Sequence, residues 1–303
     1  MTEQLHLFDF MNRYKITKPI RLIELFAGVG SQAMALRNIG ADFEHYRIVE
    51  FDQYAVRSYN AIHQTNFEPL DIRNVHAKDL GIVDITAFTY LLTYSFPCQD
   101  LSNAGKRRGM KKGSGTRSGL LWEVERLLHE CEELGTMPDV LLMENVPAVH
   151  GVKNRDDFEN WCTELRKMGY SNFWKDLNAK DYGVAQQRER CFMVSIHGDY
   201  VYTFPEPIPL TKSIEDYLED EVDQKYYINS ERAKKLLDKL IEEGKLPQTD
   251  RQTDRQTDRQ TDRQLVDACC KNPDVIEMAL ALKAKDRSIS NRKAETNAIV
   301  ERL

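Results

Sequence analysis

Five short, almost wholly apolar runs alternate with amphipathic helical patterns between residues 21 and 198, and this alternation limits the possible folds more than any other feature. Such runs are typical of parallel strands that helices cover on both faces. Apolar residues at spacings of three and four predict helices over 121–134 and 158–168. We therefore predict an α/β fold with a doubly wound, mostly parallel sheet. The expected strands span residues 21–28, 46–51, 87–96, 139–145 and 191–196.

Composition excludes several other classes of protein. The 303 residues are 41% hydrophobic, enough for a sizeable core, and no apolar run reaches the roughly 18 residues of a membrane span. The six cysteines show no CxxC spacing and no paired histidine, so neither a zinc site nor a disulfide framework is expected. A net charge of −6 argues against a generally basic surface but allows a local basic groove. Without a secretory signal, we expect a cytoplasmic protein that binds no membrane and no metal.

The chain changes character after residue 200. Residues 201–247 are first Pro-rich and then acidic, which favours a connector. TDRQ then occurs four times over 249–264 without an apolar residue, so we expect 248–264 to be a linker or a lone solvated helix. Residues 265–303 are expected to form a helical tail, and 1–200 the main domain.

The TDRQ repeat has a further implication for the coding DNA. Thr-Asp-Arg-Gln can be encoded by repeated ACAG, because a four-base repeat read in threes returns a four-residue period. Such tracts gain or lose units by slippage, and each unit shifts the reading frame. One hypothesis is that the tract controls whether a longer product is made, with 265–303 as a shifted-frame tail. The alternative is an in-frame spacer.

A glycine-rich turn follows the first expected strand. Gly28 and Gly30 permit a tight turn beneath a small molecule, and the next helix presents free N–H groups. Glu50 lies at the end of the second strand, where an acidic side chain can accept hydrogen bonds from ribose hydroxyls, and Phe51 can stack on adenine. The spacing differs from GxGxxG, which favours an adenosyl cofactor without pyrophosphate. A plain structural turn is the alternative.

Reactive and charged residues follow the later strands. Cys98 lies just past the strand at 87–96, where open α/β sheets bind ligands. The glycine-rich, cationic segment 104–119 suits a lid over a phosphate backbone. Glu144 leaves its strand at the same edge and can pair with the thiol. Arg188 and Arg190 share one side of the last strand, so one can bond a ligand carbonyl and the other a carboxylate. The alternatives are an inert cysteine, a helix-capping glutamate and a solvated charged surface.

In this order, the motifs resemble those of the cytosine-C5 DNA methyltransferases, of the bacterial and phage restriction-modification type, over residues 20–198. The motifs are FAGVGS (26–31), Glu50, PLDI (69–72), FPCQ (96–99), ENV (144–146) and QQRER (186–190). The resemblance implies the S-adenosylmethionine-dependent, Rossmann-like methyltransferase fold, with 1–200 as the catalytic and cofactor-binding domain.

The resemblance also assigns roles to individual residues. It implies that S-adenosylmethionine is bound by Phe26, Ala27, Gly28, Gly30, Glu50, Phe51, Asp71, Ile72, Pro97 and Leu121. The catalytic residues would be Cys98, Glu144, Arg188 and Arg190. Contacts with double-stranded DNA would come from Gln99, Ser102, Lys106, Arg107, Arg108, Lys111 and Lys112.

The implied reaction is methyl transfer to C5 of a flipped-out cytosine through a covalent bond between Cys98 and C6, with Glu144 at N3. The sequence lacks the Arg-Leu-Gln string of the family's ninth motif and the Gly-Asn of its last. We therefore expect a short, incomplete C-terminal region, with 201–247 beginning a recognition region that a longer product or a second polypeptide completes. Two alternatives stay open: an inactive or partner-dependent remnant, and a tRNA cytosine-C5 methyltransferase, although its Cys-Phe-Thr signature is absent.

Overall fold

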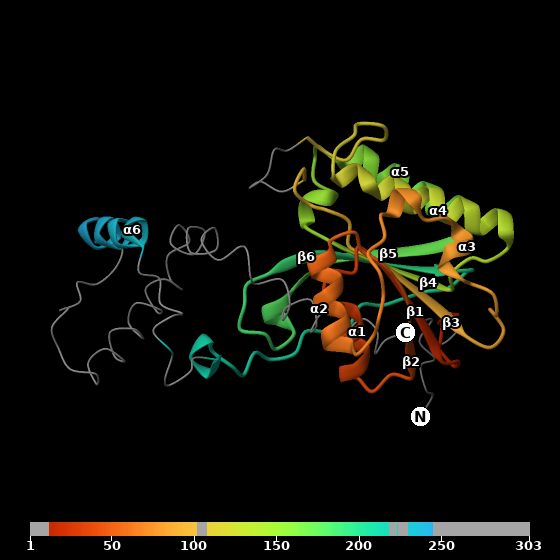
Figure 1. The fold of residues 1–303 in the computed structure, drawn as a ribbon, viewed down its shortest axis with the longest axis horizontal. Helices are drawn as coiled ribbons and strands as arrows, with labels where there is room; N and C mark the ends of the chain where they lie inside the picture. The colour runs from red at the N-terminus through yellow and green to blue at the C-terminus, as the bar shows by residue number, and fades with distance from the viewer. Residues whose placement is uncertain (1–11, 102–107, 218–222, 224–229, 245–303) are drawn as a thin grey trace, which may run out of the picture. The chain divides into compact units, whose positions relative to one another are not determined.

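Six strands form one sheet in the order β2-β1-β3-β4-β6-β5 (Figure 1). The computed structural model describes residues 12–101, 108–217, 223 and 230–244. β1 pairs in parallel with β2 and β3, and β3 with β4, which confirms the α/β fold with a mostly parallel sheet. The strands are β1 (Ile20–Leu25), β2 (Phe43–Val49), β3 (Thr89–Tyr94), β4 (Val140–Asn145), β5 (Tyr170–Asn178) and β6 (Glu189–His197).

Helices cover both faces of the sheet, as expected of a doubly wound fold (Figure 1). One face is covered by α1 (Ser31–Asn38) and α2 (Gln53–His63). The other face is covered by α3 (Ala77–Leu80), α4 (Leu121–Leu134) and α5 (Arg155–Lys167). Short 3-10 helices are η2 (Ile72–Asn74), η3 (Ser118–Leu120), η4 (Pro147–Val149), η5 (Ala179–Asp181) and η6 (Ile214–Tyr217), and α6 (Glu231–Glu242) follows.

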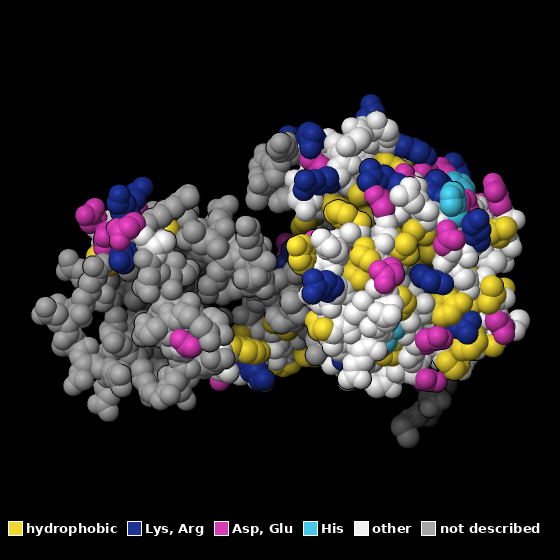
Figure 2. Space-filling view, viewed as in Figure 1, with side chains coloured by type: hydrophobic (Ala, Val, Ile, Leu, Met, Phe, Trp, Pro, Cys, Tyr) yellow, Lys and Arg dark blue, Asp and Glu magenta, His cyan; other side chains and the backbone are white. Residues whose placement is uncertain are grey.

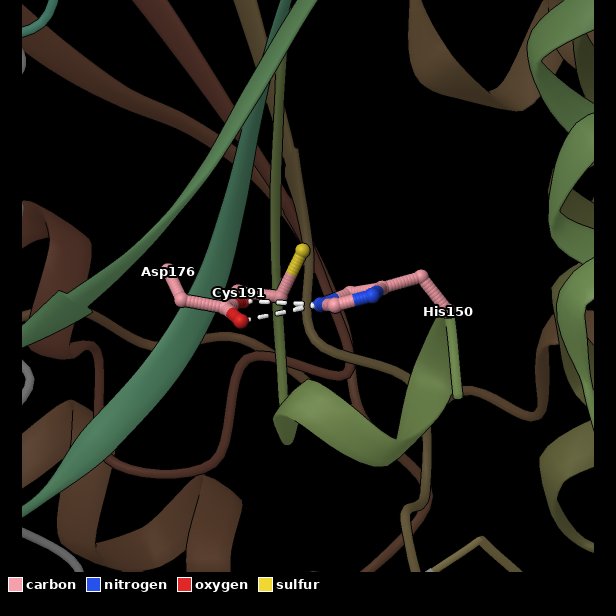
Figure 3. Close-up of side chains that lie close together, drawn as sticks. All are labelled: His150, Asp176 and Cys191. Carbon is pink, nitrogen blue, oxygen red and sulfur yellow. Dashed lines mark hydrogen bonds and ion pairs between the residues drawn. The ribbon is translucent and has the colours of Figure 1, made fainter. Parts of the chain in front are cut away.

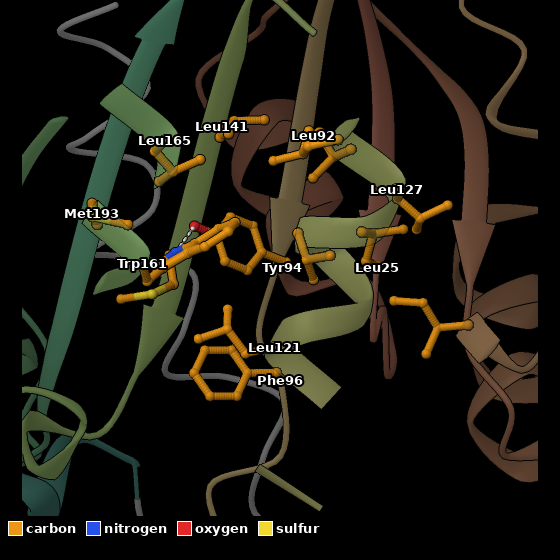
Figure 4. Close-up of a cluster of buried hydrophobic side chains, with 14 of the residues drawn as sticks. Leu25, Leu92, Tyr94, Phe96, Leu121, Leu127, Leu141, Trp161, Leu165 and Met193 are labelled. Carbon is orange, nitrogen blue, oxygen red and sulfur yellow. Dashed lines mark hydrogen bonds between the residues drawn. The ribbon is translucent and has the colours of Figure 1, made fainter. Parts of the chain in front are cut away.

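The larger hydrophobic core lies between the sheet and helices α3, α4 and α5 (Figure 4). Leu121 and Leu128 of α4 and Leu165 of α5 are buried in it, which confirms the two helices expected from their apolar spacing. The Trp161 indole N–H donates to the Tyr94 hydroxyl at 3.0 Å, so the one polar group of this tryptophan is satisfied inside the core.

Two features of the sheet differ from the sequence-based expectation. The run at 191–196 was expected to be parallel, but β6 is antiparallel to both β4 and β5. The edge strand β5 was not predicted, because only Tyr170 and Leu177 are buried in it and it lacks a continuous apolar run. The reversal has a local cause. Residues 179–188 form too short a connection for the helical crossover that parallel neighbours need.

The chain divides into two compact units at Thr211/Lys212. Residues 201–208 belong to the first unit, where Val201 and Ile208 donate backbone hydrogen bonds to Asn12 and Asp181, so this unit extends past residue 200. The second unit contributes η6 and α6 to the described residues. The predicted TDRQ linker and helical tail lie outside the described residues. Within the described ranges, no helix is long and apolar enough to cross a bilayer.

Candidate active site

Strand directions bring the sequence motifs to one edge of the sheet. β1, β2, β3 and β4 run parallel, so their carboxyl ends lie together. Residues 26–31, 50–51 and 95–99 follow the first three strands, and 144–146 include the last two residues of β4. β6 runs the opposite way, so its first residues, including Arg190, begin at this edge. Open α/β sheets bind ligands outside the carboxyl ends of their strands. This edge is therefore the candidate active site.

The turn after β1 is held in an unusual backbone conformation. Phe26, Gly28 and Gly30 all have positive φ angles, of 57°, 56° and 79°. A phenylalanine in this region is strained, and such residues cluster at ligand sites. A Cβ on Gly30 would lie 2.5 Å from the Tyr59 ring, so this position requires glycine. A Cβ on Gly28 would meet nothing within 4 Å, which leaves open space above the turn.

Glu50 connects this turn to the end of β2. Its carboxylate accepts the Gly28 N–H and the Asp52 N–H, each at 3.0 Å. A carboxylate offers about four lone-pair positions, so Glu50 can also accept hydrogen bonds from ribose hydroxyls. Phe51 is 72% exposed beside it and presents a free aromatic face. The open turn, the acidic group and the exposed ring fit the adenosyl part of S-adenosylmethionine.

The PLDI segment lies beside Glu50, because the Leu70 N–H donates to the Glu50 carbonyl at 2.8 Å. Asp71 is bound by the Arg73 guanidinium, which lowers the pKa of Asp71. Three residues expected at the cofactor site are largely or wholly buried, and their contacts with the cofactor stay predictions. They are Ala27, Ile72 and Leu121.

Two hydrogen bonds fix the chain just before Cys98. The Asn145 side chain donates to the Phe96 carbonyl at 3.0 Å, and the Ser118 hydroxyl donates to the Pro97 carbonyl at 2.6 Å. Cys98 is thereby held next to the end of β4, as a half-buried free thiol. Asn145 is part of the ENV motif and Ser118 of the segment 104–119, but the sequence assigned neither residue a role of its own. A polar residue ending the apolar run of β4 was the available signal for Asn145.

Glu144 is buried, at 4% exposure, and faces two guanidinium groups. Its Oε1 atom lies 3.1 Å from Nε of Arg190 and 4.0 Å from Nη2 of Arg188. The two arginines therefore share one side of the strand, as their alternation indicated. A buried carboxylate needs such compensating charge, because removing either partner leaves an uncompensated buried ion.

The cationic segment expected to meet DNA is partly anchored to the protein. Arg108 forms an ion pair with buried Asp100 at 3.1 Å, and Lys112 pairs with Glu125. Lys111 and Gln99 are exposed, whereas Ser102, Lys106 and Arg107 lie outside the described residues. On the face drawn in Figure 2, basic and acidic side chains are interspersed over the described part of the first unit. The DNA contacts stay predictions.

A buried polar network beneath the glycine turn was missed by the sequence reasoning. Glu24 accepts the Tyr59 hydroxyl at 2.7 Å and the Ala33 N–H at 3.4 Å. His45 Nδ1 lies 2.8 Å from the same hydroxyl. Burial raises the pKa of Glu24 to about 7 and lowers that of His45 to about 4. An acidic residue inside the apolar run of β1 was the available signal.

Comparison with known proteins agrees with this geometry. Residues 20–297 match the family model of the C-5 cytosine-specific DNA methylases, beyond the 20–198 region of the motifs. The orphan methyltransferase M.SssI of Spiroplasma monobiae is 34% identical over 266 residues, covering 71% of this chain and 68% of its own. The type II methyltransferase M2.ScrFI of Lactococcus lactis subsp. cremoris is 32% identical over 263 residues, covering 71% of each.

A solved structure shares the fold. The S. pombe Dnmt2 methyltransferase matches with a TM-score of 0.55 at 22% identity, covering 70% of this chain and 63% of that one. Membership of the matched family implies S-adenosylmethionine as the methyl donor. The fold, the motif positions and these matches together show that the chain belongs to the C-5 cytosine-specific DNA methylase family.

Proposed function

We propose that this chain transfers a methyl group from S-adenosylmethionine to C5 of a flipped-out cytosine in double-stranded DNA, through a covalent bond between Cys98 and C6. One observation carries the proposal. A single sheet edge gathers the open turn at Gly28, the fixed loop before Cys98 and the pair of Glu144 with Arg190. When bound, the cofactor supplies an electrophilic methyl group.

The residues of this chain make C5 nucleophilic. The Cys98 thiolate adds to C6, and the electrons of the C5–C6 double bond are pushed onto C5 and, through C4, toward N3. Glu144, in its carboxylic acid form, donates its proton in a hydrogen bond to N3 and so offsets the negative charge that develops there. Arg190 holds Glu144 in place, and Arg188 bonds the base carbonyl. Once C5 carries the methyl group, its proton passes to a water molecule, and the C–H electrons restore the C5–C6 double bond and expel Cys98 as a thiolate.

The base must leave the helical stack to reach Cys98. Gln99 and the cations of the segment following Cys98 contact the DNA and close over it. We place the reaction in restriction-modification, with sequence recognition completed by a longer product or a second polypeptide. The cytoplasmic location expected from the sequence stays a prediction.

Trapping with 5-fluorocytosine DNA tests the chemistry, because fluorine cannot leave C5 as the proton does. With S-adenosylmethionine present, the chain should form a covalent adduct with this DNA. Cys98→Ala should form none, whereas Cys131→Ala, which removes a thiol buried in α4, should retain the adduct. An adduct with Cys98→Ala would remove Cys98 from the role. An adduct with 5-fluorocytosine tRNA but not with DNA would favour the tRNA alternative.

Bisulfite mapping of mixed-sequence duplex DNA tests the recognition part. Base flipping costs a few kcal/mol, which contacts with the DNA must offset. In this proposal part of those contacts comes from a longer product or a second polypeptide. We therefore expect the 303-residue chain alone to methylate slowly or not at all. Rapid methylation at one defined site would contradict this and locate recognition within residues 200–303.

Sequencing the coding DNA tests the slippage hypothesis separately. Mixed codons across the TDRQ tract would remove it.

A further inference from the structure

Three potential metal ligands meet on strands β5 and β6 and the segment after η4 (Figure 3). His150 Nε2 lies 3.0 Å from each carboxylate oxygen of Asp176. The ligand atoms of His150, Asp176 and Cys191 all lie within 4.8 Å of one another. Cys191 is fully buried, whereas the His150 and Asp176 side chains are 23% and 26% exposed, so two of the three ligands reach solvent.

The surrounding packing holds these ligands in place. Asp176 and Cys191 are directly opposite in the antiparallel pair of β5 and β6, so the sheet register fixes their spacing. The His150 ring packs on the Trp174 ring, with centroids 4.6 Å apart. Trp174 lies two residues before Asp176, on the same face of β5. The three ligands are therefore positioned before any ion binds.

The cluster is separate from the candidate active site. In the register of β4 and β6, Glu144 lies opposite Phe192 and Asn145 lies opposite Cys191. Successive residues of a strand point to opposite faces, so Glu144 and Cys191 are on different faces of the sheet. Cys191 belongs to the core beneath α4 and α5. An ion at the cluster would therefore lie on the face of the sheet opposite the Glu144 carboxylate.

We propose that His150, Asp176 and Cys191 form a binding site for Zn²⁺ or a similar borderline divalent transition metal. Imidazole, carboxylate and thiolate are the ligands that Zn²⁺ prefers, and three protein ligands leave a fourth position for water. As the sulfur–metal bond forms, the thiol proton leaves to solvent, and the cation offsets the two negative charges of the thiolate and Asp176. The thiolate disfavours Mg²⁺ and Ca²⁺, which take oxygen ligands.

A second group of potential ligands is less suited to an ion. Glu125, His129 and Glu164 also approach one another. However, Glu125 is paired with Lys112, and Glu164 is paired with Lys167 at 2.7 Å. A metal at this group would have to displace both lysines, and no thiol is present to select a transition metal.

Cobalt provides the test, because a thiolate bound to Co²⁺ gives a near-ultraviolet charge-transfer band. For this test, Cys269→Ser and Cys270→Ser are introduced into the full chain, to remove two neighbouring thiols that lie outside the described residues. We expect one Co²⁺ per chain with this band, displaced by Zn²⁺ but not by Mg²⁺. Cys191→Ser should abolish the band, and Cys98→Ser should retain it.

Two further variants test the site if Cys191→Ser does not fold. His150→Ala and Asp176→Asn change partly exposed side chains and should weaken Co²⁺ binding by more than about 100-fold, beyond the usual effect of an outer-shell change. The proposal is overturned if saturating Co²⁺ gives no charge-transfer band. It is also overturned if the band survives Cys191→Ser, or if neither His150→Ala nor Asp176→Asn changes the affinity.

Discussion

Replacing Glu24 by glutamine should change how the stability of the fold depends on pH. Glu24 is 1% exposed on β1 beneath the glycine turn. Burial raises its pKa from the ordinary 4.5 to about 7, so between these values the folded chain holds a proton that the unfolded chain has lost. The stabilisation is therefore fully present below pH 4.5 and is lost as the pH rises through about 7.

The size of the effect follows from that interval. Each pH unit is worth about 1.4 kcal/mol, so ionisation of Glu24 removes about 3 kcal/mol of unfolding free energy. Glutamine does not ionise, and its amide oxygen can still accept the Tyr59 hydroxyl. Glu24→Gln should match the wild type near pH 4.5 and be about 3 kcal/mol more stable above pH 7. The corresponding rise in Tm is about 6–12 °C.

His45 provides a comparison of opposite sign. Burial lowers its pKa from 6.5 to about 4, so the unfolded chain binds more protons between these values and stability rises with pH. In the wild type this rise opposes the loss due to Glu24. Burial also lowers the pKa of neighbouring His63, which acts in the same direction as His45. In Glu24→Gln the rise due to these histidines is no longer opposed by Glu24, whereas His45→Gln should make stability fall more steeply with pH.

Urea unfolding of the full chain, followed by tryptophan fluorescence across this pH range, measures these curves. The difference in unfolding free energy between Glu24→Gln and the wild type should grow steadily from pH 4.5 to about 7. Parallel curves for the two proteins would refute the reasoning, because they would mean that burial does not keep Glu24 protonated.

Two substitutions at the site give further expected outcomes. Glu144→Gln should keep its affinity for S-adenosylmethionine in calorimetric titration but slow methyl transfer on the order of 10²–10³-fold, because Glu144 acts on the base; loss of cofactor binding would instead indicate a structural role. Gly30→Ala should lower the free energy of unfolding by about 1–3 kcal/mol more than Gly28→Ala, with a correspondingly lower Tm. Only a Cβ at position 30 would clash with the Tyr59 ring. Equal losses would mean that the clash relaxes without cost, because both positions share a positive φ.

The sequence by itself determined the class of fold and the edge at which the motifs meet. Central parallel strands are buried on both faces, and β3 and β4 are buried along their whole length, so their largely apolar sequences were visible as runs. The carboxyl ends of such strands share an edge, so Gly28, Cys98 and Glu144 could be assigned to it. The half-exposed edge strand β5 lacks such a run and was not visible.

Only the tertiary structure decided which side chains touch. The reversal of β6 brings Arg190 to 3.1 Å from Glu144, and the register of β5 with β6 brings Cys191 to Asp176 and His150. The buried bond of Tyr59 to Glu24 likewise joins helix α2 to strand β1. Periodicity reports which face of an element is buried, but it carries no information on the distant residue that meets that face. These contacts depend on strand direction and register, which packing of the whole sheet selects.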